Sequence, residues 1–130
     1  MNHQIISLPK FHDPRGNLTV VEDCAPIPFD IHRVYWLYDI PAGSERGGHS
    51  HKQQQEVLIA ISGSFQVTLT DGVESVGITL NRPDKGLLIP TGIWRTIDNF
   101  SAGAVCLVLT SAPFDEDDYI RDYDEFLKSK

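Results

Sequence analysis

Two histidines separated by one residue are the side chains of this sequence most suited to chemistry. His49 and His51 lie in the stretch GSERGGHSHKQQQEVLIAISG, which runs from Gly43 to Gly63 and also contains Glu56. On a β-strand, residues two apart face the same side, so both imidazoles would point into the same space. Two imidazoles and a carboxylate can bind a transition metal, or they can move protons without one. These three residues alone leave both chemistries open.

Arg95 favours the chemistry without a metal. The stretch around the histidines matches the motif of the cupin barrels, G-x5-H-x-H-x4-E-x6-G, at every fixed position. Metal-binding cupins usually add a histidine ligand from a P-x-G-x2-H-x3-N segment, which here reads PTGIWRTIDN, with Arg95 in the ligand's place. An arginine stays protonated and has no lone pair to donate to a metal. We therefore expect no metal and no other cofactor, and a reaction in which a proton is removed next to a carbonyl while Arg95 stabilises the developing negative charge.

Short strands would position these residues. Apolar stretches rich in Val and Ile, separated by Gly, Pro, Asn and Asp, predict strands over 31–39, 56–62, 65–70, 75–80, 86–89 and 104–110. The dipeptide Asp71-Gly72 separates two of them and indicates a hairpin turn. Many short strands at regular spacing are typical of a sandwich or barrel. Together with the histidine motif, they predict an all-β fold, a cupin or jelly-roll barrel.

The C-terminal segment is the part of the chain that we expect to be helical. After Pro113, large side chains fall at helical spacings, namely Tyr119, Tyr123, Phe126 and Leu127. The chain has 130 residues, contains no repeat or linker, and is the size of one ordinary domain. We therefore predict a single cupin domain over residues 1–130 that ends in a short helical segment.

Composition and charge narrow the classes of partner. Eleven basic and 18 acidic residues give a net charge of −7, which argues against nonspecific nucleic-acid binding because such binding needs a basic face. No apolar run approaches the roughly 20 residues that a membrane span needs, and the first ten residues, MNHQIISLPK, lack the apolar core of a signal peptide. We therefore expect a cytoplasmic protein with no nucleic-acid or membrane partner.

Further motifs, spread over nearly the whole chain, are more specific than the cupin pattern. They are DPRG at 13–16, IHRVYW at 31–36, RGGHSHK at 46–52, SGS at 62–64, DKGLLIP at 84–90 followed by Trp94, and FDEDDYIRDYDEF at 114–126. Together they resemble the sugar 3,4-ketoisomerases that act on dTDP-4-keto-6-deoxyglucose, the WxcM-like C-terminal domains. This resemblance implies a homodimer of cupin barrels that uses no metal. It also implies that the ketone of the dTDP-linked sugar moves from C4 to C3 through an enediol, for the synthesis of 3-amino-3,6-dideoxy sugars of lipopolysaccharide or surface-layer glycans.

The resemblance also implies roles for individual residues. His49 and His51 would be the acid–base pair, with His49 favoured to take the C3 proton, and Tyr35 would be their polar neighbour at the sugar. The remaining candidates would bind the sugar or its diphosphate; they are Arg15, Arg33, Arg46, Trp94 and Arg95. Arg33 and Arg46 fit surface salt bridges equally well, and Trp94 fits packing as well as stacking on the ligand. The sequence leaves open which histidine removes the C3 proton and which configuration results at C4.

Two other functions remain possible on the sequence alone. The first is a metal-dependent cupin enzyme that uses His49, His51 and Glu56. The second is a sugar-nucleotide-binding cupin without catalysis, which would not need two titratable groups directed at one carbon. A third, related reaction, 3,5-epimerisation of the same sugar, uses similar proton chemistry, but its sequence pattern is absent.

Overall fold

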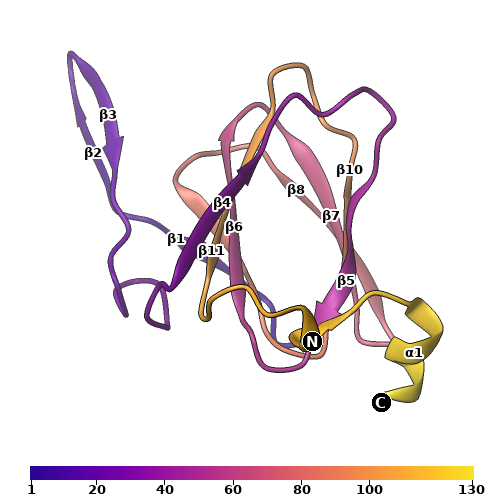
Figure 1. The fold of residues 1–130 in the computed structure, drawn as a ribbon. Coiled ribbons are helices and arrows are strands. Elements are labelled where there is room, and N and C mark those ends of the chain that lie inside the picture. Colours follow the sequence, from indigo (N-terminus) through magenta and orange to yellow (C-terminus); the bar gives the residue numbers. More distant parts are fainter.

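Two five-stranded antiparallel sheets form the walls of a barrel (Figure 1). The computed structural model describes residues 1–130. The first sheet has the order β1 (Gln4–Ser7), β9 (Lys85–Ile89), β6 (Glu56–Ser62), β11 (Val105–Thr110) and β4 (Arg33–Leu37). The second has the order β12 (Tyr119–Ile120), β5 (Arg46–His51), β10 (Trp94–Asp98), β7 (Phe65–Thr70) and β8 (Ser75–Leu80). The predicted all-β cupin barrel is confirmed.

Apolar side chains from both sheets fill the barrel. Along β7, Phe65, Val67 and Leu69 are buried while the residues between them are partly exposed, the period of two expected for a strand with one buried face. In β6 the first five residues are all buried. A second apolar cluster, which includes Ile27 and Phe29 from the connection between the third and fourth strands, packs on the outer face of the first sheet. The first sheet is therefore buried on both faces along β6.

Two of the strands that position the site, β5 and β10, were not predicted. Three predicted ranges, 56–62, 65–70 and 75–80, coincide with β6, β7 and β8, and the last two pair as a hairpin around Asp71 and Gly72. β5 and β10 lie outside the predicted ranges because their sequences, RGGHSH and WRTID, are not apolar runs. In β10 the inward positions are nevertheless buried, and they hold Arg95 and Ile97.

The C-terminal segment is less helical than predicted. It forms a short 3-10 helix (Glu116–Asp118), then β12, and then the helix α1 (Tyr123–Lys128). Tyr119 is not helical, because it pairs with His51 on the edge of β5. The helix α1 begins at Tyr123, and the side chain of Asp122 caps its N-terminus. The helical prediction is therefore wrong for Tyr119. Neither helix is long and apolar enough to cross a bilayer.

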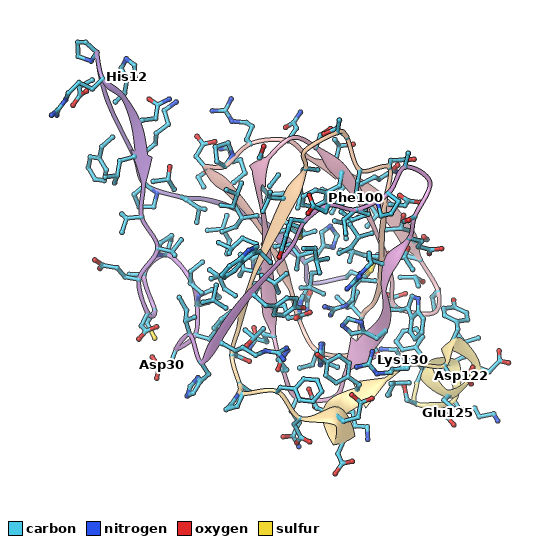
Figure 2. All side chains as sticks on the ribbon, turned by 45° about the horizontal axis from the view of Figure 1, so that its top comes forward. His12, Asp30, Phe100, Asp122, Glu125 and Lys130 are labelled. Carbon is cyan, nitrogen blue, oxygen red and sulfur yellow. The ribbon has the colours of Figure 1, made fainter.

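A hairpin of β2 (Lys10–Asp13) and β3 (Gly16–Thr19) projects from the barrel (Figure 1). Figure 2 shows His12 near its tip, well clear of the barrel. Phe11 and Leu18 are 62% and 59% exposed on this hairpin. The hairpin thus presents apolar side chains that its own chain does not cover.

Candidate active site

A cavity between the two sheets brings together most of the residues predicted to act on substrate. Its volume is about 240 Å³. The first sheet contributes Tyr35 from β4 and Glu56 from β6, and the second contributes His49 from β5 and Arg95 from β10. Arg95 is the direct cross-strand partner of His49, so the two side chains lie next to each other on the same face of the second sheet.

The carboxylate of Glu56 is the centre of this site. The residue is 1% exposed. Its Oε1 forms an ion pair with Arg95 and faces the Nε2 atoms of His49 and His51, at 3.9 Å and 3.5 Å. Its Oε2 accepts a hydrogen bond of 3.0 Å from the hydroxyl of Tyr35. One buried carboxylate therefore bonds to Arg95 and Tyr35 and faces both histidines, while His49 Nε2 has no hydrogen-bond partner within the protein.

Burial and this network set the protonation states. Burial alone would raise the pKa of Glu56, but the Arg95 charge and the two histidines hold it well below its usual value, so the carboxylate is ionised. Burial lowers the pKa of His49 to about 4, although contact with Glu56 opposes this shift. Burial, followed by the charge of Glu56, raises the pKa of Tyr35. Near neutral pH the cavity therefore presents a neutral imidazole and a neutral phenol, which are a proton acceptor and a hydrogen-bond donor.

His51 lies behind His49 and does not line the cavity. Its side chain is fully buried, and the two imidazole rings meet edge to face with centroids 4.8 Å apart. The ring of Tyr119 packs on both, at 4.9 Å from His49 and 4.4 Å from His51. The Nδ1 atom of His51 is 3.0 Å from Asp118 Oδ2, and its Nε2 is 3.5 Å from the amide nitrogen of Gln54. Both ring nitrogens of His51 therefore have a polar neighbour, Asp118 at Nδ1 and Gln54 at Nε2.

The donor set does not fit a resident metal ion. Atoms of His49, His51 and Glu56 all lie within 4.8 Å of one another, which is compatible with binding one ion. The guanidinium of Arg95, however, contacts the Glu56 oxygen that both histidines face. A cation there would meet a fixed positive charge and would compete with it for the same carboxylate oxygen. The arginine therefore takes the position that a metal would need.

Besides Arg95, three arginines line the cavity. Arg33 and Arg46, both predicted to bind phosphate, line it together with Arg121. Arg33 donates to the hydroxyl of Tyr119 at 3.2 Å, while its Nε is buried without a partner. Arg121 forms an exposed ion pair of 2.6 Å with Glu116. The cavity thus has a cationic rim formed by Arg33, Arg46 and Arg121.

Two predicted binding residues do not reach the cavity of their own chain. Arg15 lies at the turn of the projecting hairpin, where its side chain is 90% exposed and pairs with Asp13 at 2.7 Å. Trp94 occupies a position on β10 that alternates with Arg95, and its ring packs on Tyr123 and Phe126 at 5.3 Å and 5.7 Å. Of the two readings of Trp94, packing is therefore the observed one, and stacking on a ligand in this cavity is ruled out by its direction.

Several residues around the site were not predicted. Asp118, Tyr119 and Arg121 come from the C-terminal segment, for which the spacing of large side chains predicts a helix. Their one signal in the sequence was the motif FDEDDYIRDYDEF, which carries no spacing rule for a site. Gln54 lies inside the histidine motif, but at a position that the motif leaves free.

Known proteins with similar sequences and structures are sugar ketoisomerases. The sequence matches the FdtA family, WxcM-like, C-terminal, over residues 1–130. The TDP-4-oxo-6-deoxy-alpha-D-glucose-3,4-oxoisomerase of Aneurinibacillus thermoaerophilus is 41% identical over 128 residues, which cover 98% of this chain and 92% of that protein.

Two solved structures support the same relationship. The TDP-quinovose 3,4-ketoisomerase WlaRB of Campylobacter jejuni has 46% identity and a TM-score of 0.93, with 98% of each chain covered. A histidine-to-asparagine variant of the 3,4-ketoisomerase QdtA of Thermoanaerobacterium thermosaccharolyticum, in complex with TDP-4-keto-6-deoxyglucose, has 40% identity and a TM-score of 0.97, covering 98% of this chain and 93% of that one.

Proposed function

We propose that this chain, which belongs to the WxcM-like C-terminal family, is a sugar 3,4-ketoisomerase that converts dTDP-4-keto-6-deoxyglucose to a dTDP-3-keto-6-deoxyhexose. The observation that carries the proposal is the neutral imidazole of His49 at the cavity wall, held beside the buried ion pair of Glu56 and Arg95. A proton acceptor next to fixed hydrogen-bond donors is what the removal of a proton beside a ketone requires.

His49 is the group that takes the C3 proton in this proposal. The ketone at C4 makes the C3 hydrogen acidic, and His49 lines the cavity whereas His51 lies behind it. Removal of the C3 proton leaves an enediolate whose charge rests on O4. Tyr35, kept protonated by its raised pKa, would turn its hydroxyl from Glu56 to O4, and together with Arg95, whose Nε has no partner, it stabilises this charge as a donor.

Return of a proton to the neighbouring carbon completes the isomerisation. O4 gains a proton and O3 loses one, while C4 receives a proton from the acid–base pair, so the ketone ends at C3. The substrate and the product are isomers, and C4 is reduced by the same two electrons by which C3 is oxidised. No external oxidant or reductant is therefore needed, and the donor set at Glu56 gives no reason to add a metal.

The experiment is to incubate the protein with dTDP-4-keto-6-deoxyglucose and to identify the product by NMR. We expect a 3-keto product, whose spectrum also gives the configuration at C4. The same preparation is analysed for transition metals and treated with a chelator. Full activity with well under one ion per chain supports the metal-free mechanism, whereas stoichiometric metal that is lost together with activity contradicts it. Binding of the nucleotide sugar without turnover would favour a non-catalytic cupin instead.

The cationic rim is proposed to bind the diphosphate. Arg33 has a buried Nε without a partner, and Arg46 is exposed beside it at the same cavity. Arginine forms charge-assisted hydrogen bonds with phosphate oxygens, often two at a time. The sugar would then lie inward, toward His49, with the nucleotide toward the rim.

We further propose that residues 1–130 act as one domain and that two copies form a homodimer. Val34, Trp36 and Tyr38 of the outer face around β4 are between 46% and 59% exposed, and the hairpin adds Phe11 and Leu18. Exposed apolar surface of this kind is typical of a protein interface. Light scattering at micromolar concentration should give about twice the chain mass of 14.5 kDa, and a clean monomer would contradict the proposal.

In a dimer, Arg15 of one chain could contact the substrate bound to the other chain. In its own chain the hairpin holds Arg15 away from the cavity, so we propose that the hairpin reaches the cavity of a second copy. Mixing an Arg15→Ala protein with a His49→Asn protein tests this. Hybrid dimers would regain part of the activity only if Arg15 acts across the interface.

The proposed substrate suggests the cell compartment and pathway. Nucleotide-linked sugars are made in the cytoplasm, and a 3-keto product is the substrate that an aminotransferase needs to make a 3-amino sugar. We therefore propose a cytoplasmic enzyme in the synthesis of lipopolysaccharide or surface-layer glycans.

A further inference from the structure

The C-terminal segment folds across the end of β5 and contacts His51 on the side away from Glu56. β12 extends the second sheet, with Tyr119 opposite His51 and Ile120 opposite Ser50. Just before β12, Asp118 Oδ2 lies 3.0 Å from His51 Nδ1, and the side chain of Asp118 is 11% exposed. A residue 67 positions along the chain thus supplies the second partner of a buried histidine.

The carboxylate of Asp118 is itself held in place by the backbone. Its Oδ1 accepts the N–H of Gln53 at 2.7 Å, and its Oδ2 accepts the N–H of Gln54 at 3.1 Å. The backbone carbonyl of Asp118 also accepts the N–H of Lys52 at 3.0 Å. Three consecutive residues that follow His51 are therefore bonded to this one aspartate, which fixes its orientation toward the imidazole.

This arrangement decides which nitrogen of His51 carries the proton. An ionised carboxylate can only accept hydrogen bonds, so Nδ1 must be the N–H of the neutral ring. The lone pair then lies on Nε2, which is 3.5 Å from the amide nitrogen of Gln54 and 3.5 Å from Glu56 Oε1. If Nε2 takes up a proton, the resulting imidazolium lies between two carboxylates.

We propose that Asp118 is a positioning residue of the isomerase. It holds His51 as the Nδ1–H tautomer with Nε2 directed at the catalytic centre, and it stabilises the imidazolium that forms when His51 takes a proton. The catalytic part of this statement rests on the proposed function, whereas the tautomer does not. An aspartate that fixes the tautomer of a catalytic histidine in this way is known from serine proteases, where its replacement by asparagine costs about 10⁴ in kcat.

The neighbouring acidic residues do not share this role. Asp115 caps the 3-10 helix by accepting the N–H of Asp117 at 3.1 Å. Asp117 is exposed, and it contacts Lys52 through its backbone carbonyl, at 2.9 Å, rather than through its carboxylate. Asp117→Asn therefore removes the same charge one residue away without touching His51, which makes it a matched control.

Asparagine at position 118 cannot satisfy all three donors. If its NH₂ group takes the place of Oδ1, it opposes the N–H of Gln53; if it takes the place of Oδ2, it opposes the N–H of Gln54 and also donates to His51 Nδ1. In the latter case the ring must carry its proton on Nε2, the wrong nitrogen for accepting one. Because substrate contacts are unchanged, we expect kcat to fall by roughly 10²–10⁴, with KM and dTDP affinity changing less than threefold.

The test measures kcat, KM and dTDP binding for Asp118→Asn, Asp117→Asn, His51→Asn and the double variant of His51 and Asp118. If Asp118 acts through His51, Asp118→Asn should lower kcat in the wild-type background and change it less than threefold when His51 is already asparagine. Asp117→Asn should keep the wild-type kcat. Equal losses in both backgrounds, or full activity of Asp118→Asn, would overturn the proposal.

A second measurement needs no activity and no variant. Two-dimensional NMR of the wild-type protein with ¹⁵N-labelled histidine distinguishes the two tautomers, and we expect the proton of His51 on Nδ1. A proton on Nε2 in the wild type would overturn the proposal even if the enzyme is active. If the expected tautomer is found in a protein that does not isomerise the sugar, the proposed function fails and the pairing of His51 with Asp118 stands.

Discussion

Arg95 and Arg15 each pair with a carboxylate, but one pair lies at the centre of the barrel and the other at the tip of a hairpin. Both side chains of the Arg95–Glu56 pair are 1% exposed, whereas those of the Arg15–Asp13 pair are 90% and 45% exposed. Water screens the outer pair, while the inner pair has replaced its water shell with protein contacts. An arginine–carboxylate pair therefore serves as a fixed catalytic centre in one place and as a surface contact in the other.

The largest expected difference between the two pairs is in stability. Arg95→Ala leaves Glu56 buried without its counter-charge, which should lower the free energy of unfolding by about 3–5 kcal/mol. Arg15→Ala should leave it unchanged within error, because both groups of that pair remain in water. Urea unfolding of the two variants measures both values. Similar losses for the two would contradict the distinction between them.

A double replacement separates the charge of the inner pair from its packing. Glu56→Leu together with Arg95→Met removes both charges and keeps apolar volume. Because a buried ion pair can be replaced by apolar residues at little cost, the double variant should be roughly 2 kcal/mol more stable than Arg95→Ala. It should also be inactive, since the centre that orients His49 is gone. A double variant less stable than Arg95→Ala would show that the pair itself stabilises the fold.

Burial of His49 predicts a dependence of stability on pH that no exposed histidine gives. Its pKa is lowered by burial to about 4, against 6.5 for the ordinary side chain. Between these two pH values, His49 is protonated in the unfolded chain and neutral in the folded one. Stability from this residue is present above pH 6.5 and is lost as the pH falls toward 4. Between pH 7 and pH 5 the free energy of unfolding should fall by about 2 kcal/mol through His49.

Two histidine variants isolate this contribution. His49→Gln should remove most of the decrease, because the buried titrating group is gone. His12→Gln, at the exposed hairpin, should keep it. If the decrease between pH 7 and pH 5 is the same in all three proteins, another group is responsible.

A smaller effect is expected at the rim of the cavity. Arg33→Ala removes a donor whose Nε has no partner in the protein, and one charge-assisted hydrogen bond to a phosphate corresponds to roughly a tenfold or greater rise in KM. Arg82→Ala is the control, because Arg82 pairs with Asp84 at 2.9 Å outside the cavity. Steady-state kinetics should show the change in KM for Arg33 only. An unchanged KM for Arg33→Ala would place the diphosphate elsewhere.

The contrast between the centre of the barrel and the projecting hairpin also explains which parts of the structure the sequence could predict. The barrel and the histidine pair follow from local rules, because strand alternation and the spacing of His49, His51 and Glu56 do not depend on distant residues. Arg95 was placed correctly because its motif fixes its strand position. Arg15 lies away from the cavity of its own chain because a residue type says nothing about which way a hairpin projects. Trp94 follows the packing alternative, since it alternates with Arg95 along β10.

The residues missed by sequence reasoning share one physical cause. Asp118 and Tyr119 reach His51, 67 and 68 positions earlier in the chain, only because the C-terminal segment adds a strand to β5. Local spacing in that segment favours a helix, and the long-range pairing overrides it. Nothing in the acidic stretch itself distinguishes Asp118, which is directed inward, from Asp117, which faces solvent.

Solvent exchange during turnover tests the central claim most directly. The account has His49 removing the C3 proton and the acid–base pair returning a proton to C4, so the reaction run in D₂O should place deuterium at C4 of the 3-keto product. His49→Asn should lower the rate by roughly 10²–10⁴ while dTDP binding persists. Product that forms in D₂O without deuterium at C4, or a His49→Asn enzyme with a near-normal rate, would contradict the proposed proton transfer.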